Sequence, residues 1–308
     1  MKKILLLILL FMTTLLGACT NDEPNKPSTI ENNVTIIAPN GTPYIALGGL
    51  LNTENIEITA VNGADNLKSG LVEGSYDIII APINVGAQLF KKGNSQYKIA
   101  AVITMNNAYI VTTSDNKLDS IDDLANQQVL GFGANGIPGS ILKTLYNKND
   151  NLNVENIDFT QSSSSAVYSL FANNSNFKYA LLSQPEIAKL QINDNKNIKT
   201  LDLCDALGTD VPQACIFVNP NSEHLDDVNT VLNMIKDNIK TLNNNPNDYV
   251  DSIISLDRNY AAIGSEVLKA SLPNMDIIYN EALNMKTEID NILTILGVGD
   301  TENEFYYS

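Results

Sequence analysis

Three glycines with the spacing of a phosphate-binding loop lie between a strand pattern and a helix pattern. Gly131, Gly133 and Gly136 satisfy G-x-G-x-x-G, and a glycine-rich turn before a helix presents unpaired backbone N–H groups that favour an anion or a polar oxygen. Asp158 follows 22 residues after Gly136, where an acid that binds a ribose hydroxyl would stand. The same pattern also arises by chance wherever glycines mark turns between strands and helices. A dinucleotide site is therefore one interpretation of this loop, and contact with another polar ligand is the other.

A run of four serines, from Ser162 to Ser165, is the second candidate for chemistry. A serine nucleophile needs a neighbouring base, and no base accompanies this run in the sequence. Serines directly before a helix pattern are typical helix caps and hydrogen-bond donors. The one histidine, His224, is not close in sequence to Cys204 or Cys215, so these residues do not have the spacing of a metal site. We therefore expect no catalytic residue and no metal. We also expect no cofactor, because the export signal described next would place the chain where it meets little nicotinamide cofactor.

The first residues have the pattern of an export signal. Two lysines after Met1 precede an unbroken apolar run from Ile4 to Met12, which is short for a membrane span. The following Leu-Gly-Ala-Cys resembles the lipobox of bacterial lipoproteins, in which the cysteine, here Cys19, becomes the lipidated first residue. We expect residues 1–18 to be a signal peptide and residues 19–33 to be the acylated (for example palmitate-bearing) cysteine and a flexible tether. The protein would then be extracytoplasmic, anchored to the outer face of the cell membrane; ordinary secretion is the alternative.

The charge balance is strongly acidic. The formal net charge is -16, and loss of two lysines with the signal peptide lowers it by two. Such a balance argues against binding to nucleic acid and against electrostatic adhesion to anionic lipid. Arg258 is the one arginine in the sequence, so no basic patch is expected.

Two cysteines remain after the predicted anchor. Cys204 and Cys215 are eleven positions apart and flank a turn-rich stretch. Outside the cytoplasm a disulfide is possible, and closing a loop of this size would stabilise the protein by about 3 kcal/mol. Two buried thiols that behave as small hydrophobic side chains are equally consistent with the sequence.

Strand and helix patterns alternate along most of the chain, which favours mostly parallel sheets covered by helices. The predicted strands are 33–39, 56–61, 76–81, 97–113, the start of 129–146, 154–160, 178–182 and 214–219. From residue 223 onward the pattern is helical throughout. These late helices have no strands of their own to cover, so we expect most of them to pack on the first unit. Residues 34–112 and 215–308 would then form lobe 1, and residues 113–214 would form lobe 2 as an insertion.

Three sequence blocks, in this order, carry a resemblance: YDIIIAPINVGAQL, SIDDLANQQVLGFGANGIPGSIL and KYALLSQPEIAKL. Behind a lipoprotein signal they resemble the periplasmic-type solute-binding proteins of ABC importers. The order is similar to the nitrate, sulfonate and thiamine-precursor binding group, called SsuA/THI5-like or NMT1-like, over residues 34–296. The resemblance implies an α/β, two-lobed periplasmic-binding-protein-like fold of type 2, in which each lobe is a mixed sheet flanked by helices and two hinge crossings join the lobes. It also implies a monomer that binds a small molecule between its lobes and delivers it to an ABC permease with its ATPase.

In that family the ligand lies at the carboxyl ends of strands and the starts of helices, as in other open α/β sheets. Carried over position by position, the resemblance implies ligand contacts at Thr42, Pro43, Tyr44, Ile83, Asn84, Asn106, Asn107, Asn135, Gly136, Ile137, Gln161, Ser162, Ser163, Ser183 and Gln184. Glu186 departs from the family's usual Glu-Pro order, so whether it faces the cleft stays open. Tyr109 is consistent with stacking on a ligand ring and equally with the core.

The candidate turns contain no lysine or arginine. An anion would have to be held by helix N-termini, backbone N–H groups and hydroxyls. A neutral or aromatic ligand would fit the Asn, Gln, Ser and Tyr side chains as well or better. Two functions from other classes stay open. One is an exported enzyme related to the THI5-like pyrimidine synthases, which consume a histidine of their own, and the other is a ligand-sensing surface lipoprotein with no transport role.

Overall fold

The computed structural model describes residues 29–173 and 176–308. Glu31–Ser308 forms one compact unit, and the fold below is that of this unit. The predicted signal peptide, Cys19 and most of the predicted tether lie outside the described residues. Within the described ranges, none of the helices combines the length and the apolar character that crossing a membrane requires.

A six-stranded sheet, in the order β11-β4-β10-β3-β1-β2, forms the first half of the fold. Its strands are β1 (Val34–Pro39), β2 (Ile56–Val61), β3 (Ile78–Pro82), β4 (Lys98–Thr104), β10 (Ala214–Val218) and β11 (Ile277–Glu281). β1 is parallel to β2 and β3, whereas β10 is antiparallel to both β3 and β4. β1 to β4 therefore run in the same direction, and their carboxyl ends lie at one edge of the sheet. β3 is a β-branched run of high strand propensity, and four of its five residues are buried, as expected for a central strand covered on both faces.

A five-stranded sheet, in the order β7-β6-β8-β5-β9, forms the second half. Its strands are β5 (Tyr109–Thr113), β6 (Val129–Phe132), β7 (Ile157–Gln161), β8 (Tyr179–Leu182) and β9 (Ile198–Asp202). β6 is parallel to β7 and β8, and β5 is antiparallel to β8 and β9. The carboxyl ends of β6, β7 and β8 thus share one edge of this sheet.

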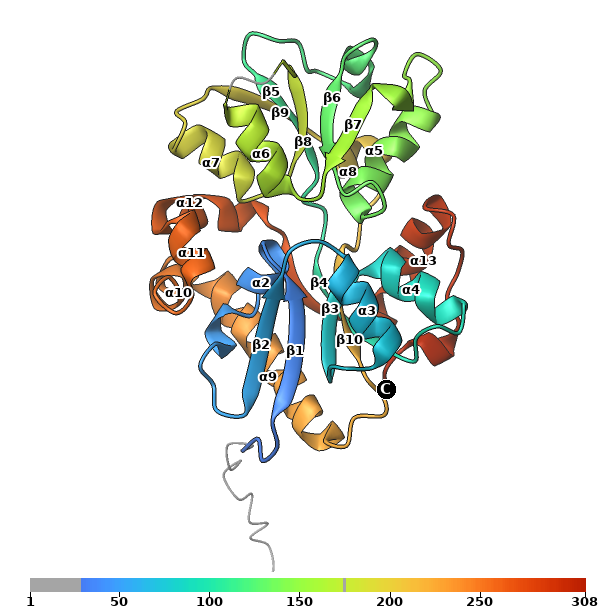
Figure 1. Ribbon diagram of the computed structural model, residues 1–308, viewed down its shortest axis with the longest axis vertical. Helices are drawn as coiled ribbons and strands as arrows, with labels where there is room; N and C mark the ends of the chain where they lie inside the picture. Colours follow the sequence, from blue (N-terminus) through green and yellow to red (C-terminus); the bar gives the residue numbers. More distant parts are fainter. Residues whose placement is uncertain (1–28, 174–175) are drawn as a thin grey trace, which may run out of the picture. The chain divides into compact units, whose positions relative to one another are not determined.

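Helices cover both faces of each sheet (Figure 1). The α-helices are α2 (Thr42–Ile45), α3 (Asp65–Glu73), α4 (Ile83–Lys91), α5 (Ile137–Asn147), α6 (Ser164–Ala172), α7 (Glu186–Ile192), α8 (Leu203–Leu207), α9 (Leu225–Asn244), α10 (Pro246–Ile253), α11 (Arg258–Ile263), α12 (Ser265–Ser271) and α13 (Lys286–Ile295). Short 3-10 turns lie at Gly48–Leu50, Ile121–Leu124, Val154–Asn156, Leu272–Asn274, Ala282–Met285 and Asn303–Phe305. α3 and α4 pack on one face of the first sheet, with α13 beside α4, and α9 packs on the other face, while α6 and α5 pack on the second sheet.

Two crossings connect the halves, at residues 105–108 and 208–213. They lie side by side, because Met105 bridges Pro212 and the Asn106 N–H donates to the Val211 carbonyl at 2.9 Å. One hydrophobic core cluster continues through the crossings, by way of Met105 and Ala108, into both sheets. We call the part built on the six-stranded sheet lobe 1 (residues 31–104 and 214–308). The part built on the five-stranded sheet is lobe 2 (residues 109–207).

The fold class agrees with the expectation: two mixed sheets, each flanked by helices, make a two-lobed α/β fold. Two details differ. The stretch 97–113 is two strands in different sheets, with the chain turning at Asn106 and Asn107, both at positive φ, so the first crossing comes before residue 109. The chain after residue 223 is not entirely helical, because β11 pairs with β4 at the sheet edge. A short Ile-Ile-Tyr segment is too brief for periodicity to separate strand from helix.

Candidate functional site

A cavity of about 540 Å³ lies where the carboxyl edges of the two sheets meet. The lobe 1 strands contribute their last residues to its wall, namely Pro39, Val61, Pro82 and Thr104. Lobe 2 contributes Phe132 at the end of β6 and the residues that directly follow β7 and β8. Its volume is in the range of pockets that enclose a small organic molecule. The strand order of each sheet thus brings turns that are distant in sequence to one place.

Ten of the fifteen residues implied by the resemblance line this cavity: Thr42, Pro43, Tyr44, Asn107, Gly136, Ile137, Ser162, Ser163, Ser183 and Gln184. The other five, Ile83, Asn84, Asn106, Asn135 and Gln161, are not among the lining residues. Several of them bind other parts of the protein. The Asn84 side chain donates to the Asn135 carbonyl across the two lobes at 2.9 Å. Asn106 donates to the Asp276 carboxylate at 2.7 Å, and Gln161 donates to the Thr160 hydroxyl at 3.0 Å.

The lobe 1 wall is built around the start of α2. Gly41, at φ 100, turns the chain from β1 into this short helix. Asn40 donates to Asn62 at 2.8 Å, while its own Oδ1 atom is buried without a hydrogen-bond partner. The Nε2 atom of Gln213 is likewise buried and unpaired. The wall therefore carries one unpaired acceptor and one unpaired donor beside the cavity.

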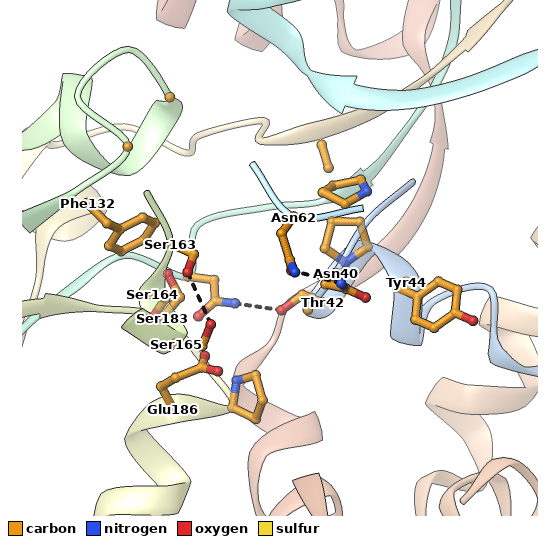
Figure 2. A pocket seen from close by; sticks show the side chains of 18 of the residues that line it. Asn40, Thr42, Tyr44, Asn62, Phe132, Ser163, Ser164, Ser165, Ser183 and Glu186 are labelled. Atoms are coloured by element: carbon orange, nitrogen blue, oxygen red, sulfur yellow. Dashed lines mark hydrogen bonds between the residues drawn. The ribbon is translucent and has the colours of Figure 1, made fainter. Parts of the chain in front are cut away.

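Tyr44 forms the far side of the same wall. Its hydroxyl donates to Asp257 at 3.1 Å, and its ring centroid lies 5.1 Å from that of Tyr260. The Tyr260 hydroxyl donates back to the Tyr44 carbonyl at 2.8 Å. Burial raises the pKa of the Tyr44 phenol, and the neighbouring Asp257 carboxylate raises it further. The phenol is therefore neutral at ordinary pH. In Figure 2 the Tyr44 ring points away from the serines.

The lobe 2 wall is built from serines at the start of α6. Ser163 is the N-cap residue, and its hydroxyl accepts from the Ala166 N–H at 3.3 Å and lies 3.1 Å from the Ser165 hydroxyl. The Ser183 N–H donates to the Ser164 hydroxyl at 3.0 Å, which ties the end of β8 to α6. Thr42 and Asn62 lie across the cavity from these serines in Figure 2. The serines are caps and hydrogen-bonding groups, and no lining residue is a histidine or a cysteine.

The glycine loop before α5 has a packing reason for its composition. A Cβ atom at Gly139 would lie 2.3 Å from the Gly133 carbonyl oxygen, and Gly133 itself adopts φ 58. A Cβ atom at Gly131 would lie 2.9 Å from the Phe159 ring. Asp158 is not a lining residue, and its carboxylate accepts from the Thr160 N–H. Packing and backbone conformation therefore account for Gly131, Gly133 and Gly139, whereas a Cβ atom at Gly136 would lie at 3.4 Å from the Gly133 carbonyl oxygen, an ordinary contact distance.

Two charged residues line the cavity, and both lie on α7. Glu186 is 7% exposed, and its Oε1 atom lies 3.3 Å from the Lys189 Nζ atom. Burial raises the pKa of the Glu186 carboxyl more than Lys189 and Ser164 lower it. Lys189 also lies 5.7 Å above the ring of Tyr168. Glu186, whose position the sequence left open, therefore faces the cavity together with a lysine that the candidate turns did not include.

Hydrogen bonds connect the lobes behind the cavity. The Thr42 hydroxyl donates to the Gln184 carbonyl at 3.2 Å and accepts from the Asn107 side chain at 3.0 Å. The Gln184 N–H in turn donates to the Asn107 Oδ1 atom at 2.7 Å. Asn107 belongs to the first crossing, so one side chain of the hinge contacts both lobes at the cavity wall.

Other predicted residues lie elsewhere. Cys204 and Cys215 are both free and buried in the structure, which agrees with the alternative of two buried thiols. Burial raises the pKa of both. Tyr109 does not line the cavity, and burial raises its pKa to about 12. The backbone N–H of His224 donates to the Ser222 hydroxyl at the amino-terminal edge of the first sheet. In the described part of the chain, no cluster of three or more His, Cys, Asp and Glu residues could hold a metal ion.

Sequence reasoning missed several lining residues, including Asn40, Asn62, Phe132, Lys189, Gln213, Asn259 and Tyr260. Asn40 and Phe132 stand at strand ends, and the same rule that selected Thr42 would have included them. Lys189 lies one helical turn beyond the turn at residues 183–186, so a search confined to turns misses it. Asn259 and Tyr260 belong to α11, which reaches the cavity only through tertiary packing.

Comparison with known proteins shows the fold. No family model matches the sequence, and a search of curated proteins also found no match. Among solved structures, an ABC transporter protein from Parabacteroides distasonis is 16% identical with a TM-score of 0.72, covering 90% of this chain and 99% of that one. The ligand-binding component of an ABC-type import system from Staphylococcus aureus is 15% identical with a TM-score of 0.67, covering 90% and 97%. The periplasmic aliphatic sulphonate-binding protein SsuA from Escherichia coli is 10% identical with a TM-score of 0.65, covering 89% and 90%. The chain therefore has the two-lobed periplasmic-binding-protein fold found in solute-binding proteins of ABC importers, as its sequence blocks implied.

Proposed function

We propose that this chain is the extracytoplasmic, lipid-anchored solute-binding component of an ABC importer, which binds a small organic molecule between its lobes and delivers it to the permease. The observation that carries the proposal is the cavity of about 540 Å³ with walls from both lobes. A ligand that fills such a cavity contacts both lobes at once, so its binding energy favours the closed arrangement. Lobe closure can then be read by a membrane partner.

The chemistry of the lining supports binding rather than turnover. Ser163 caps α6, no histidine or aspartate is among the lining residues, and the one lining carboxylate, Glu186, is paired with Lys189. The enzyme alternative would need His224 near a substrate, but His224 neighbours Asp77 and Ser222 at the opposite edge of the first sheet. A binding function needs only the hydrogen-bonding and apolar side chains that line the cavity.

The anchor rests on the sequence and on the point where the fold begins. The Leu-Gly-Ala-Cys segment ends at Cys19, and the chain is held to the fold from residue 31. The backbone N–H groups of Glu31 and Asn32 both donate to the Asp227 carboxylate at 3.0 Å. The segment between Cys19 and Glu31 is long enough to act as a tether between a lipid and lobe 1.

Native mass spectrometry of the mature protein, followed by calorimetry with any molecule that co-purifies, tests this function. We expect one molecule per chain in the wild type and none in Ser162→Trp, where an indole occupies the cavity. Ser169→Trp is the matched control, because Ser169 is on α6, the helix that follows Ser162, is exposed and does not line the cavity. A molecule that is retained by Ser162→Trp, or that the protein converts to a product, would contradict the proposal.

A further inference from the structure

The charges of the cavity wall are concentrated at one place. Among its lining residues, Glu186 and Lys189 are the charged side chains, and the rest are apolar or neutral polar groups. The two charges cancel, so the wall as a whole offers no net positive charge to an anion. The molecule around it carries a formal net charge of -16, which lowers the local concentration of anions and raises that of cations.

Glu186 has weaker partners than a buried carboxylate needs. Its ion pair with Lys189 is long, at 3.3 Å, and its other interactions are with the Ser164 hydroxyl and its own backbone N–H. A buried carboxylate is stable as an ion only when donors replace the water it has lost. Burial outweighs these partners and raises the pKa of Glu186. A further hydrogen-bond donor from the cavity would therefore stabilise the ionised carboxylate.

Lys189 is less available to a ligand than Glu186. Its ammonium group pairs with Glu186 and lies 5.7 Å above the Tyr168 ring, a cation–π distance that favours its present position. An anionic ligand at Lys189 would have to compete with the Glu186 carboxylate and would lie beside it. Lys189 is thus a positioning residue that orients the carboxylate.

The neutral part of the wall is consistent with a ligand of mixed character. Asn40 Oδ1 and Gln213 Nε2 are an unpaired acceptor and an unpaired donor on the lobe 1 side. Leu67, Phe132 and Ile263 supply apolar surface for the body of a ligand. In Figure 2 the Glu186 carboxylate lies beside Ser165, on the lobe 2 side of the cavity.

We propose that Glu186 selects the ligand: its carboxylate accepts hydrogen bonds from a nitrogen-bearing head group that is neutral or cationic, such as an amine, an amidine or an amino-heterocycle. The proposal rests on the proposed binding function and narrows its ligand class. Molecules whose only polar head is an anion, such as alkyl sulfonates, are excluded by the same carboxylate.

Three probes with one ring and different head groups test this selection: benzamidine, benzamide and benzenesulfonate. Calorimetry on the mature chain should show benzamidine bound more tightly than benzenesulfonate. Glu186→Gln should weaken benzamidine about tenfold to a hundredfold, the range of a hydrogen bond to a charged group, and should not weaken benzenesulfonate. Glu73→Gln, an exposed glutamate at the end of α3, is the matched control and should leave all three unchanged. Tighter binding of benzenesulfonate in the wild type, or an unchanged probe order in Glu186→Gln, would overturn the proposal.

Two further readouts separate selection from a structural role. If Glu186 served only as a structural ion pair, Glu186→Gln would lower the unfolding temperature. If its carboxylate is poorly paired, as we propose, Glu186→Gln leaves the unfolding temperature unchanged or raises it. If none of the three probes binds, the head group of any co-purified molecule tests the proposal instead. A head with N–H donors supports the proposal, and a purely anionic head overturns it while leaving the binding function intact. Absence of any bound molecule, together with no probe binding, overturns the binding function itself and the selection with it.

Discussion

Two carboxylates, Asp77 and Glu186, lie at opposite edges of the sheets and differ in how many hydrogen bonds they accept from the protein. Asp77 directly precedes β3, at the amino-terminal edge of the first sheet. It accepts from the Thr35 N–H at 2.9 Å, the Thr35 hydroxyl at 2.7 Å and the Ser222 hydroxyl at 2.6 Å. Glu186 opens α7 at the carboxyl-terminal edge of the second sheet, with a long ion pair as its main contact. Burial acts to raise the pKa of both carboxyls; at Asp77 the hydrogen bonds from Ser222 and Thr35 outweigh burial and lower the pKa below its usual value, whereas at Glu186 burial prevails and the pKa is raised.

This difference shows at which edges of the sheets buried polar groups lack hydrogen-bond partners within the protein. At the amino-terminal edge, Asp227 also accepts three hydrogen bonds, from Glu31 and Asn32. At the carboxyl-terminal edges, Asn40, Asn84 and Gln213 carry buried side-chain atoms without a partner, and in the rest of the described chain Tyr146 and Asp194 do so as well. We infer that the amino-terminal edge holds the fold together, and that the carboxyl-terminal edges are completed by what binds there. The predictions that follow test this division.

The largest expected effect is the loss of Asp77. Asp77→Ala removes three hydrogen bonds and leaves the Thr35 N–H and the Ser222 hydroxyl without their acceptor. We expect the free energy of unfolding to fall by about 2 to 3 kcal/mol, measured by urea denaturation. Ligand affinity should not change. Asp150→Ala, at an exposed loop position, is the control and should change stability by less than about 0.5 kcal/mol. An equal effect of both variants would remove the distinction.

The stabilisation by Asp77 should depend on pH in a stated direction. A carboxyl whose folded-state pKa lies below its unfolded value stabilises the fold above the unfolded pKa, and loses this effect as pH falls through the folded pKa. The stability difference between wild type and Asp77→Asn should therefore be full at pH 6 and should shrink below about pH 4. Denaturation curves from pH 3 to pH 7 measure it. A difference that grows as the pH falls would contradict the assignment.

A smaller effect is expected at the interlobe hydrogen bonds. Thr42→Val keeps the shape of the side chain but removes the acceptor of Asn107 and the donor to Gln184. We expect a loss of about 1 kcal/mol in stability and a measurable change in affinity, because these groups lie at the cavity wall. Thr241→Val, whose exposed hydroxyl bonds only its own helix, is the control. Unchanged affinity in Thr42→Val would mean that these bonds do not contribute to binding.

The smallest effect on stability is expected at Gln213. Gln213→Met removes the unpaired Nε2 atom and keeps the length of the side chain, so stability should stay within about 0.5 kcal/mol of wild type or rise. Affinity for the co-purified molecule should fall nonetheless. Gln128→Met, at an amide that donates to Asn156 away from the cavity, is the comparison variant. A clear loss of stability in Gln213→Met would mean that Gln213, like Asp77, stabilises the fold and is not reserved for a ligand.

Much of this organisation could be predicted from the sequence, for identifiable reasons. Alternating strand and helix patterns indicate α/β architecture, and a buried run such as Ile78–Ala81 fixes a central strand. Turns after such strands must meet at one edge, which is why Thr42 and Gln184 were found among the lining residues. The crossings predicted near residues 110 and 215 lie within a few residues of those in the structure. Asn106 and Asn107 interrupt the strand pattern at the first crossing, but the pattern does not show that its two halves belong to different sheets.

The remaining lining residues depend on tertiary packing. Asn259 and Tyr260 lie 150 or more residues from most of the predicted turns of lobe 1, and no local pattern marks α11 as part of the site. Lys189 looks like a solvated helix residue in the sequence, and only the packing of α7 beside α6 makes it partly buried. Whether Cys204 and Cys215 are bonded could not be predicted from the sequence either, because their spacing is consistent with a disulfide or with two thiols.

Hydrogen–deuterium exchange of the mature chain, with and without its co-purified molecule, tests the central claim most directly. The claim is that a ligand completes the carboxyl-terminal edges of both lobes. We expect slower exchange on binding in residues 40–44 of lobe 1 and in residues 163–166 and 183–189 of lobe 2. No change is expected around Thr35, Asp77 and Ser222. Slower exchange confined to one lobe, or found mainly at the amino-terminal edge, would contradict this account.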